Sequence, residues 1–168
     1  MDANMYARAQ LVDAHRMVRA ALRDATDTEL AWQPPGRANS AGETYLHMLT
    51  AEDGFIHRTL QGATRVWDAD GWAERLGVPE LPRLGDWSAI HGRAFTLDAL
   101  APYQQAVHAA SLAYAESLTP ADFDRPVEFA GRSVPLADVL ARVAVHTCLH
   151  AGEIATLRGL QGVTALPF

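Results

Sequence analysis

Four stretches of roughly twenty residues carry apolar side chains at the three- and four-residue spacing of amphipathic helices. They span residues 4–24, 40–61, 97–118 and 135–158. The second stretch starts at Ser40, with Glu43 three positions later, which is the pair that forms a capping box. Because such helices bury their apolar faces against one another, we predict an all-α four-helix bundle, with one domain over residues 1–168.

The stretch from Ala63 to Thr96 interrupts this pattern with glycines and two prolines. We expect a long irregular excursion there, between the second and third helices, with one short helix near Trp72–Leu76. Tryptophans 67, 72 and 87 bracket this excursion, and they either anchor it to the bundle, as such residues most often do, or form the wall of a substrate pocket. A small hairpin that turns at Ala130-Gly131 is expected before the last helix.

The strongest chemical signal lies in the last predicted helix, where His146 and His150 stand four residues apart. Four residues advance an α-helix by about 400°, so the two imidazoles share one face, about 6 Å apart along the axis. That face also carries the apolar stripe, so we expect both rings to point into the bundle. Such a pair can bind a divalent metal, and two hydrogen-bonded core histidines would show the same spacing.

The residues around this pair exclude two familiar kinds of metal site. Thr147 stands where a protease of the H-E-x-x-H type carries its glutamate base. The E-x-x-H pairs of a di-iron bundle are absent from the sequence. A mononuclear site remains, and it needs a third ligand from another helix. His47 in the second helix is the favoured candidate, and His108 in the third helix is an alternative.

The other histidines and the cysteine suit different roles. His57 follows His47 by ten residues, about 15 Å along one helix, so the two cannot bind the same ion. His15 lies on the apolar stripe of the first helix, and we interpret it as a polar core residue. His91 falls in the excursion, where we expect it to be solvated. Cys148 is interpreted as a small core filler.

Four short motifs, spread over nearly the whole chain, together resemble the sequence pattern of one protein family. They are Leu30-Ala31-Trp32 through Pro35, Ala38-Asn39-Ser40-Ala41-Gly42 leading into Leu46-His47-Met48, Leu118-Thr119-Pro120-Ala121-Asp122, and H-x-x-x-H-x-G-E-I from His146 to Ile154. This pattern resembles the DinB/YfiT-like superfamily of metalloenzymes. The resemblance implies an up-down-down-up four-helix bundle whose metal is held by His47, His146 and His150. Glu153 stands where the family often has glutamine, and it is a candidate either to orient a ligand histidine or to form a hydrogen bond between helices.

The amino-acid composition indicates which kinds of partner the protein can bind and where in the cell we expect it. The basic residues are all arginines, so no lysine is present for a Schiff base or a P-loop nucleotide site. The net charge of -6 disfavours nucleic acid as a partner. Apolar runs stay well below the ~18 residues that span a bilayer, and the N-terminus lacks the pattern of a secretory signal. With a single cysteine as well, we expect a cytoplasmic protein without a disulfide or a membrane partner.

Three neutral histidines leave a bound ion with open positions, as in catalytic sites. We expect one divalent transition metal (Zn, Ni or Fe), because imidazole binds each of them. The resemblance implies a low-molecular-weight thiol as cosubstrate, so the first hypothesis is a metal-dependent S-transferase or isomerase that acts on a small electrophilic molecule. The alternatives are a metal-dependent hydrolase that uses metal-bound water and a non-enzymatic, stress-associated metal-binding module. We also expect a homodimer.

Overall fold

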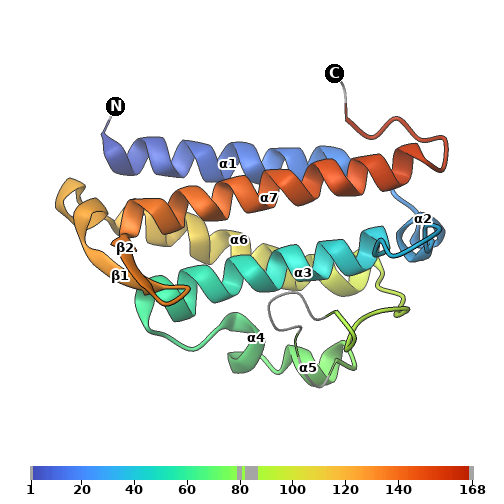
Figure 1. The fold of residues 1–168 in the computed structure, drawn as a ribbon, viewed down its shortest axis with the longest axis horizontal. Coiled ribbons are helices and arrows are strands. Elements are labelled where there is room, and N and C mark those ends of the chain that lie inside the picture. The colour runs from blue at the N-terminus through green and yellow to red at the C-terminus, as the bar shows by residue number, and fades with distance from the viewer. Residues whose placement is uncertain (1, 79–80, 82–86, 167–168) are drawn as a thin grey trace.

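The computed structural model describes residues 2–78, 81 and 87–166, and over these residues it shows a bundle of long helices (Figure 1). The long helices are α1 (Ala3–Ala21), α3 (Ala41–Asp53), α6 (Leu97–Ser117) and α7 (Leu136–Gly159). Figure 1 shows that α1 and α7 run in one direction, and α3 and α6 in the other. The predicted all-α, up-down-down-up bundle is therefore confirmed. None of the helices in the described part of the chain combines the length and hydrophobicity that a bilayer-spanning segment requires.

The helix that was predicted as one stretch over residues 40–61 changes its winding midway. It begins with the expected capping box, in which Ser40 accepts from the backbone N–H of Glu43 and Glu43 accepts from that of Ser40. After α3 it continues as a π-helix, η1 (Gly54–Gln61), and ends at Gly62 with a φ of 63°. Glycine adopts this left-handed conformation without a steric penalty, which explains the stop. Segments of π-helix occur often at functional sites, so η1 directs attention to this end of the helix.

Two short helices lie between the predicted long helices, in segments for which the sequence predicted no helix. They are α2 (Asp27–Ala31) and the 3-10 helix η2 (Pro120–Asp124). Both follow a threonine: Thr26 accepts a hydrogen bond from the N–H of Glu29, and Thr119 forms a capping box with Asp122. Periodicity over ten or more residues cannot detect helices this short, because they have no second turn on which to repeat.

The predicted hairpin is present between η2 and α7. Strands β1 (Pro126–Phe129) and β2 (Arg132–Pro135) pair antiparallel, with Phe129 opposite Arg132. Ala130 and Gly131 both have positive φ, at 50° and 75°. Two positive φ values are the geometry of the tight hairpin turns that match strand twist.

The excursion between η1 and α6 contains two short helices where one was predicted. They are α4 (Val66–Ala69) and α5 (Trp72–Arg75), which lie beside α3 and α6 and away from α1 (Figure 1). The carboxylate of Asp53 accepts hydrogen bonds from the backbone N–H groups of Val66 and Trp67, at 3.0 and 2.9 Å. Trp67 and Trp72 are buried, and both rings contact the ring of Tyr103. These contacts tie the start of the excursion to the bundle.

A layer of buried polar side chains divides the core of the bundle. One apolar cluster joins the C-terminal halves of α1 and α7 to α3 and the N-terminal half of α6, and a second cluster joins η1 to the other ends of α6 and α7 and to α1. Between the two clusters lie His15, Glu52, His108, Ser111 and Thr147, each at most 9% exposed. Buried polar groups destabilise a fold unless they are paired, so this layer needs a physical account of its own.

Candidate metal centre

Three histidines meet where α3 and α7 pack together. His47 extends from α3, and His146 and His150 extend from α7. One nitrogen of each ring lies within 4.8 Å of the corresponding nitrogens of the other two. The Nε2 atoms of His146 and His150 are 3.1 Å apart. The structure therefore brings together the three residues that the sequence singled out, and we call this group the open histidine cluster.

The surroundings of the open histidine cluster keep two of its imidazoles, those of His47 and His146, neutral. Burial lowers the pKa of His47 to about 4, and the charge of His150 lowers it too. The pKa of His146 is also lowered to about 4, first by burial and then by its two histidine neighbours. Both rings are uncharged near pH 7 and offer the lone pair that a metal ion requires.

Glu153 contacts the outer nitrogen of the third ring. Its Oε2 lies 2.7 Å from Nδ1 of His150, one helical turn away on α7. With Nδ1 donating its proton to this carboxylate, Nε2 keeps its lone pair on the side of His146, 3.1 Å away. Metal-binding histidines characteristically make such an outer hydrogen bond, which fixes the ring and raises its basicity.

The open histidine cluster borders a hollow of about 670 Å³. Its lining combines the two ligand candidates His47 and His146 with four large apolar side chains and three arginines: Phe55, Leu81, Trp87, Phe129, Arg58, Arg65 and Arg142. The ring of Trp87 stands 4.3 Å from that of His47, and the ring of Phe55 stands 5.9 Å from that of His146. The excursion contributes Arg65, Leu81 and Trp87, so part of it lies at the wall of this hollow, as expected.

The charge that lines the hollow is positive. No aspartate or glutamate stands among its described lining residues. Arg65 is paired with Asp68, with nitrogen–oxygen distances of 2.9 and 3.0 Å, and Arg58 lies 3.8 Å from the same carboxylate. Arg142 forms no ion pair with any residue that the structure describes. A small anion in this hollow would meet favourable electrostatics.

The remaining histidines lie outside this cluster. His108, the alternative third ligand, stacks on His15 in the polar layer, with ring centroids 3.5 Å apart. His15 is buried, in agreement with its interpretation as a polar core residue. Nδ1 of His57 lies 2.7 Å from Oδ1 of Asp53, and the His91 side chain is 57% exposed.

The interpretation of Cys148 as a core filler is wrong, because the structure shows this side chain exposed. Cys148 lies two positions from each of His146 and His150, which corresponds to about 200° around the helix. Since the two histidines face inward, this angle puts the thiol on the outer face of α7.

Sequence reasoning missed Glu52. Its carboxylate lies in the polar layer, within 4.8 Å of ring nitrogens of His15 and His108. The available signal was its position three residues after Leu49 and four before Ile56, on the inward stripe of its helix. A charged residue on an apolar stripe indicates a buried partner.

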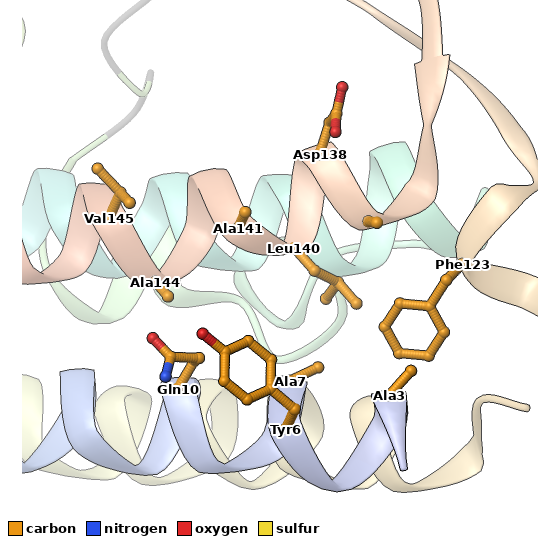
Figure 2. A pocket seen from close by; sticks show the side chains of 11 residues that line it. Ala3, Tyr6, Ala7, Gln10, Phe123, Asp138, Leu140, Ala141, Ala144 and Val145 are labelled. Carbon is orange, nitrogen blue, oxygen red and sulfur yellow. The ribbon is translucent and has the colours of Figure 1, made fainter. Parts of the chain in front are cut away.

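A second hollow of about 390 Å³ lies between α1 and α7. Figure 2 shows Tyr6 and Gln10 of α1 facing Leu140 and Ala144 of α7 across it. Its described lining contains no histidine or cysteine, and Asp138 is its one carboxylate there. A single carboxylate does not make a transition-metal site, so the open histidine cluster is the stronger candidate of the two locations.

Comparisons with known proteins agree with this architecture. A family model described as the DinB superfamily matches residues 10–154. The chain is similar to the crystal structure of a conserved protein from Enterococcus faecalis, with a TM-score of 0.81 and 18% identity over 95% of this chain and 97% of that one. It is also similar to a DinB-like protein from Bacillus subtilis, with a TM-score of 0.62 and 18% identity over 97% of this chain and 96% of that one. The two structures share the fold of this chain; no curated protein matches its sequence.

Proposed function

Because this chain belongs to the DinB superfamily, whose members often bind metal, we propose that the open histidine cluster is the metal centre of an enzyme. His47, His146 and His150 would hold one divalent transition metal, with Zn, Ni and Fe as the candidates. The proposed activity is thiol-dependent S-transfer to, or isomerisation of, a small electrophilic molecule. The observation that carries the proposal is the meeting of three imidazoles beside a hollow large enough for such a molecule.

The donor set fits such an ion. Three imidazoles are the protein ligands of catalytic zinc sites, which keep a further position for water or substrate. Structural sites are closed by four protein ligands, and no fourth histidine, cysteine or carboxylate joins this group among the described residues. The low pKa of His47 and of His146, about 4 for each, means that neither ring has to lose a proton near pH 7.

A bound divalent ion supplies Lewis acidity, which lowers the pKa of a thiol or a water molecule beside it. The chain's own contribution starts with Glu153, which holds the proton at Nδ1 of His150 and leaves Nε2 free to bind. Trp87 and Phe55 cover His47 and His146 with apolar surface on the side of the hollow. This apolar surface lowers the polarity beside the two rings, and charge interactions are stronger in less polar surroundings.

The lining of the hollow supports a substrate class. Its four large apolar side chains suit an aromatic or branched aliphatic body. One of its three arginines, Arg142, forms no ion pair with a described residue, and it suits a carboxylate because the guanidinium group matches a carboxylate with two parallel hydrogen bonds. We therefore propose that the electrophile or the thiol carries at least one carboxylate.

The metal centre is tested by elemental analysis and by metal titration of protein without a histidine tag. His150→Ala should bind one equivalent fewer than the wild-type protein, because two histidines alone form a weak site. His91→Ala serves as the matched control, since that ring is exposed outside the hollow. An unchanged metal count in His150→Ala would contradict the proposed centre.

The activity is tested by screening electrophiles, with and without a low-molecular-weight thiol, on the metal-loaded protein. Consumption that needs both thiol and metal, and that disappears in His150→Ala, would support the proposed chemistry. Consumption without thiol, with water added to the product, would favour the hydrolase instead. No turnover of any substrate by a fully loaded protein would favour the non-enzymatic module.

The assembly is proposed separately. Tyr6 and Val145 are 58% and 62% exposed, and both line the hollow between α1 and α7 (Figure 2). Exposed apolar surface of this kind is typical of interaction sites, and we propose that a second copy of the chain covers it in a homodimer. Light scattering should give twice the chain mass for the wild-type protein and the chain mass itself for Val145→Glu. A monomeric wild-type protein would overturn this assembly.

A further inference from the structure

The polar layer of the core holds a second group of side chains that can ligate a metal. Ligand atoms of His15, Glu52 and His108 lie within 4.8 Å of one another. They come from three different helices, α1, α3 and α6, and are 2%, 1% and 9% exposed. We call these three residues the buried polar cluster. Metal sites in helical bundles are built in this way, from inward side chains on facing helices.

The carboxylate of Glu52 stands at the centre of the buried polar cluster. Its Oε1 lies 2.8 Å from Nε2 of His15 and accepts a hydrogen bond from the Ser111 hydroxyl at 2.6 Å. Its Oε2 accepts from the hydroxyl of Thr147 at 3.3 Å. Burial alone would raise the pKa of Glu52, but its contacts with His15, His108 and Ser111 lower it below the ordinary value. Glu52 is therefore an ionised carboxylate inside the bundle, and the two hydroxyls fix its orientation.

His108 leaves one nitrogen of this group without a partner. Its Nε2 is buried and forms no hydrogen bond with any residue that the structure describes. Burial lowers the pKa of His108 to about 4, so the ring is neutral near pH 7. The ring lies flat on that of His15, with 4° between the planes. A buried nitrogen without a hydrogen-bond partner destabilises a folded protein, so its presence needs an explanation.

We propose that His15, Glu52 and His108 form a second site for a divalent transition-metal ion, inside the bundle. Two imidazoles and one carboxylate are the protein ligands of one class of zinc enzymes and of non-haem iron sites. The ion would bind the unpaired nitrogen of His108 and compensate the negative charge of the Glu52 carboxylate. Two nitrogens bound to one tetrahedral ion are about 3.3 Å apart, and an imidazole binds an ion in its own plane, so the stacked rings of His15 and His108 would turn toward each other as the ion enters.

This second site is separate from the open histidine cluster. Glu52 follows His47 by five residues on α3, which corresponds to about 7.5 Å along the helix axis. The hydrogen-bond partner of Glu52, Thr147, directly follows His146 on α7. The side chain of Thr147 is fully buried. The hollow beside the open histidine cluster is lined by neither His15, Glu52 nor His108. The site would accordingly hold its ion without a substrate position.

The test counts metal ions in the full-length chain without a tag. Protein is produced in medium supplemented with Co²⁺, which allows the ion to enter during folding, and a second sample is stripped with chelator and titrated with Co²⁺. The ion is counted by elemental analysis, and its ligand geometry is read from the visible absorption bands. The variants are His108→Phe, which keeps a flat ring without ligand atoms, His150→Ala, and the double variant, with His91→Ala as the matched control.

We expect two ions in the wild-type protein and in His91→Ala, one in each single variant with a different spectrum, and none in the double variant. A wild-type protein with one ion that survives in His150→Ala and disappears in His108→Phe would also support the buried site, while contradicting the open one. A His108→Phe variant that binds as many ions as the wild-type protein would overturn the proposal. So would a His150→Ala variant that binds none.

A second variant keeps the test independent of any folding defect in His108→Phe. Glu52→Gln retains the size of the side chain and its capacity for hydrogen bonds but removes the anionic ligand. In the His150→Ala background it should lower the affinity for Co²⁺ at least 100-fold. Unchanged affinity in this folded variant would overturn the proposal as well.

Discussion

The open histidine cluster and the buried polar cluster differ in donors and surroundings, although one bundle holds both. The open histidine cluster has three imidazoles, takes two of them from one helix, and borders a hollow of about 670 Å³. The buried polar cluster has two imidazoles and a carboxylate from three helices, each at most 9% exposed. From this difference we expect access to decide the roles: the open cluster would exchange ligands with solvent, whereas the closed cluster would act mainly on the stability of the fold.

The largest expected effect concerns the open histidine cluster alone. His150→Ala should weaken metal binding at that cluster at least about 1000-fold, or about 4 kcal/mol, because it removes one of three ligands. The free energy of unfolding of the metal-free protein should change far less, since the fold does not depend on this ring. Competition with a chelator of known affinity measures the first quantity, and urea denaturation measures the second. A variant that still binds within tenfold of the wild-type affinity would remove the functional distinction between the two clusters.

The same substitution in the two clusters separates their contributions to stability. Glu52→Gln should lower the free energy of unfolding of the metal-free protein by about 3 kcal/mol, because it removes the charged partner of a buried group. Glu153→Gln should lower it by less than about 0.5 kcal/mol, because Glu153 is 39% exposed. Urea denaturation near pH 7 checks both values. Equal losses in the two variants would contradict the division between a stabilising and a functional cluster.

Low pH should reduce the free energy of unfolding through protonation of His108 in the buried polar cluster. Its pKa is about 4 in the folded protein, mainly through burial, and about 6.5 in the unfolded chain. The unfolded state therefore binds a proton first, so this contribution to stability is complete above pH 6.5 and is lost as the pH falls toward 4. Between pH 7 and pH 5, metal-free wild-type protein should lose about 2 kcal/mol more than His108→Phe.

Urea denaturation of both proteins at several pH values measures this difference. The comparison between the two proteins removes the effects of other titrating groups, such as His47 and His146. If the free energy of unfolding changes with pH in the same way in the wild-type protein and in His108→Phe, the pKa of His108 is not lowered in the folded protein.

The smallest expected effect tests the orientation of His150. Glu153→Gln should lower the metal affinity of the open histidine cluster about tenfold, because an amide accepts the Nδ1 proton less strongly than a carboxylate. Glu116→Gln is the matched control, since Glu116 pairs with Arg8 on the surface. Calorimetric titration with Zn²⁺ resolves a change of this size. An affinity equal to that of the control would mean that Glu153 does not tune the ligand.

Much of the fold could be read from the sequence. The starts and ends of α1, α6 and α7 lie within three residues of the predicted bounds, because apolar periodicity and capping residues are local signals. The shared face of His146 and His150 follows from helix geometry alone. The same geometry gave the outward face of Cys148, so its interpretation as a core residue was an error in applying the rule and not a limit of the sequence.

Which histidines from different helices come together depends on how the helices pack against one another. Periodicity shows which face of a helix turns inward, but it does not show how far one helix slides along the next. His47 and His108 both lie on inward faces, and only the packed bundle puts His47 beside α7 and stacks His108 on His15.

The surroundings of Arg158, near the C-terminal end of α7, also depend on how the helices pack. It is 1% exposed, pairs with Glu29 and donates to the carbonyl oxygens of Ala21 and Arg23 at the end of α1. Sequence placed it in a last helical turn, where arginine is common on the surface. The sequence thus determined the helices, their inward faces and one pair of ligand candidates. The tertiary structure decided which side chains from different helices stand at the same level, because that depends on packing over the whole interface and not on any local repeat.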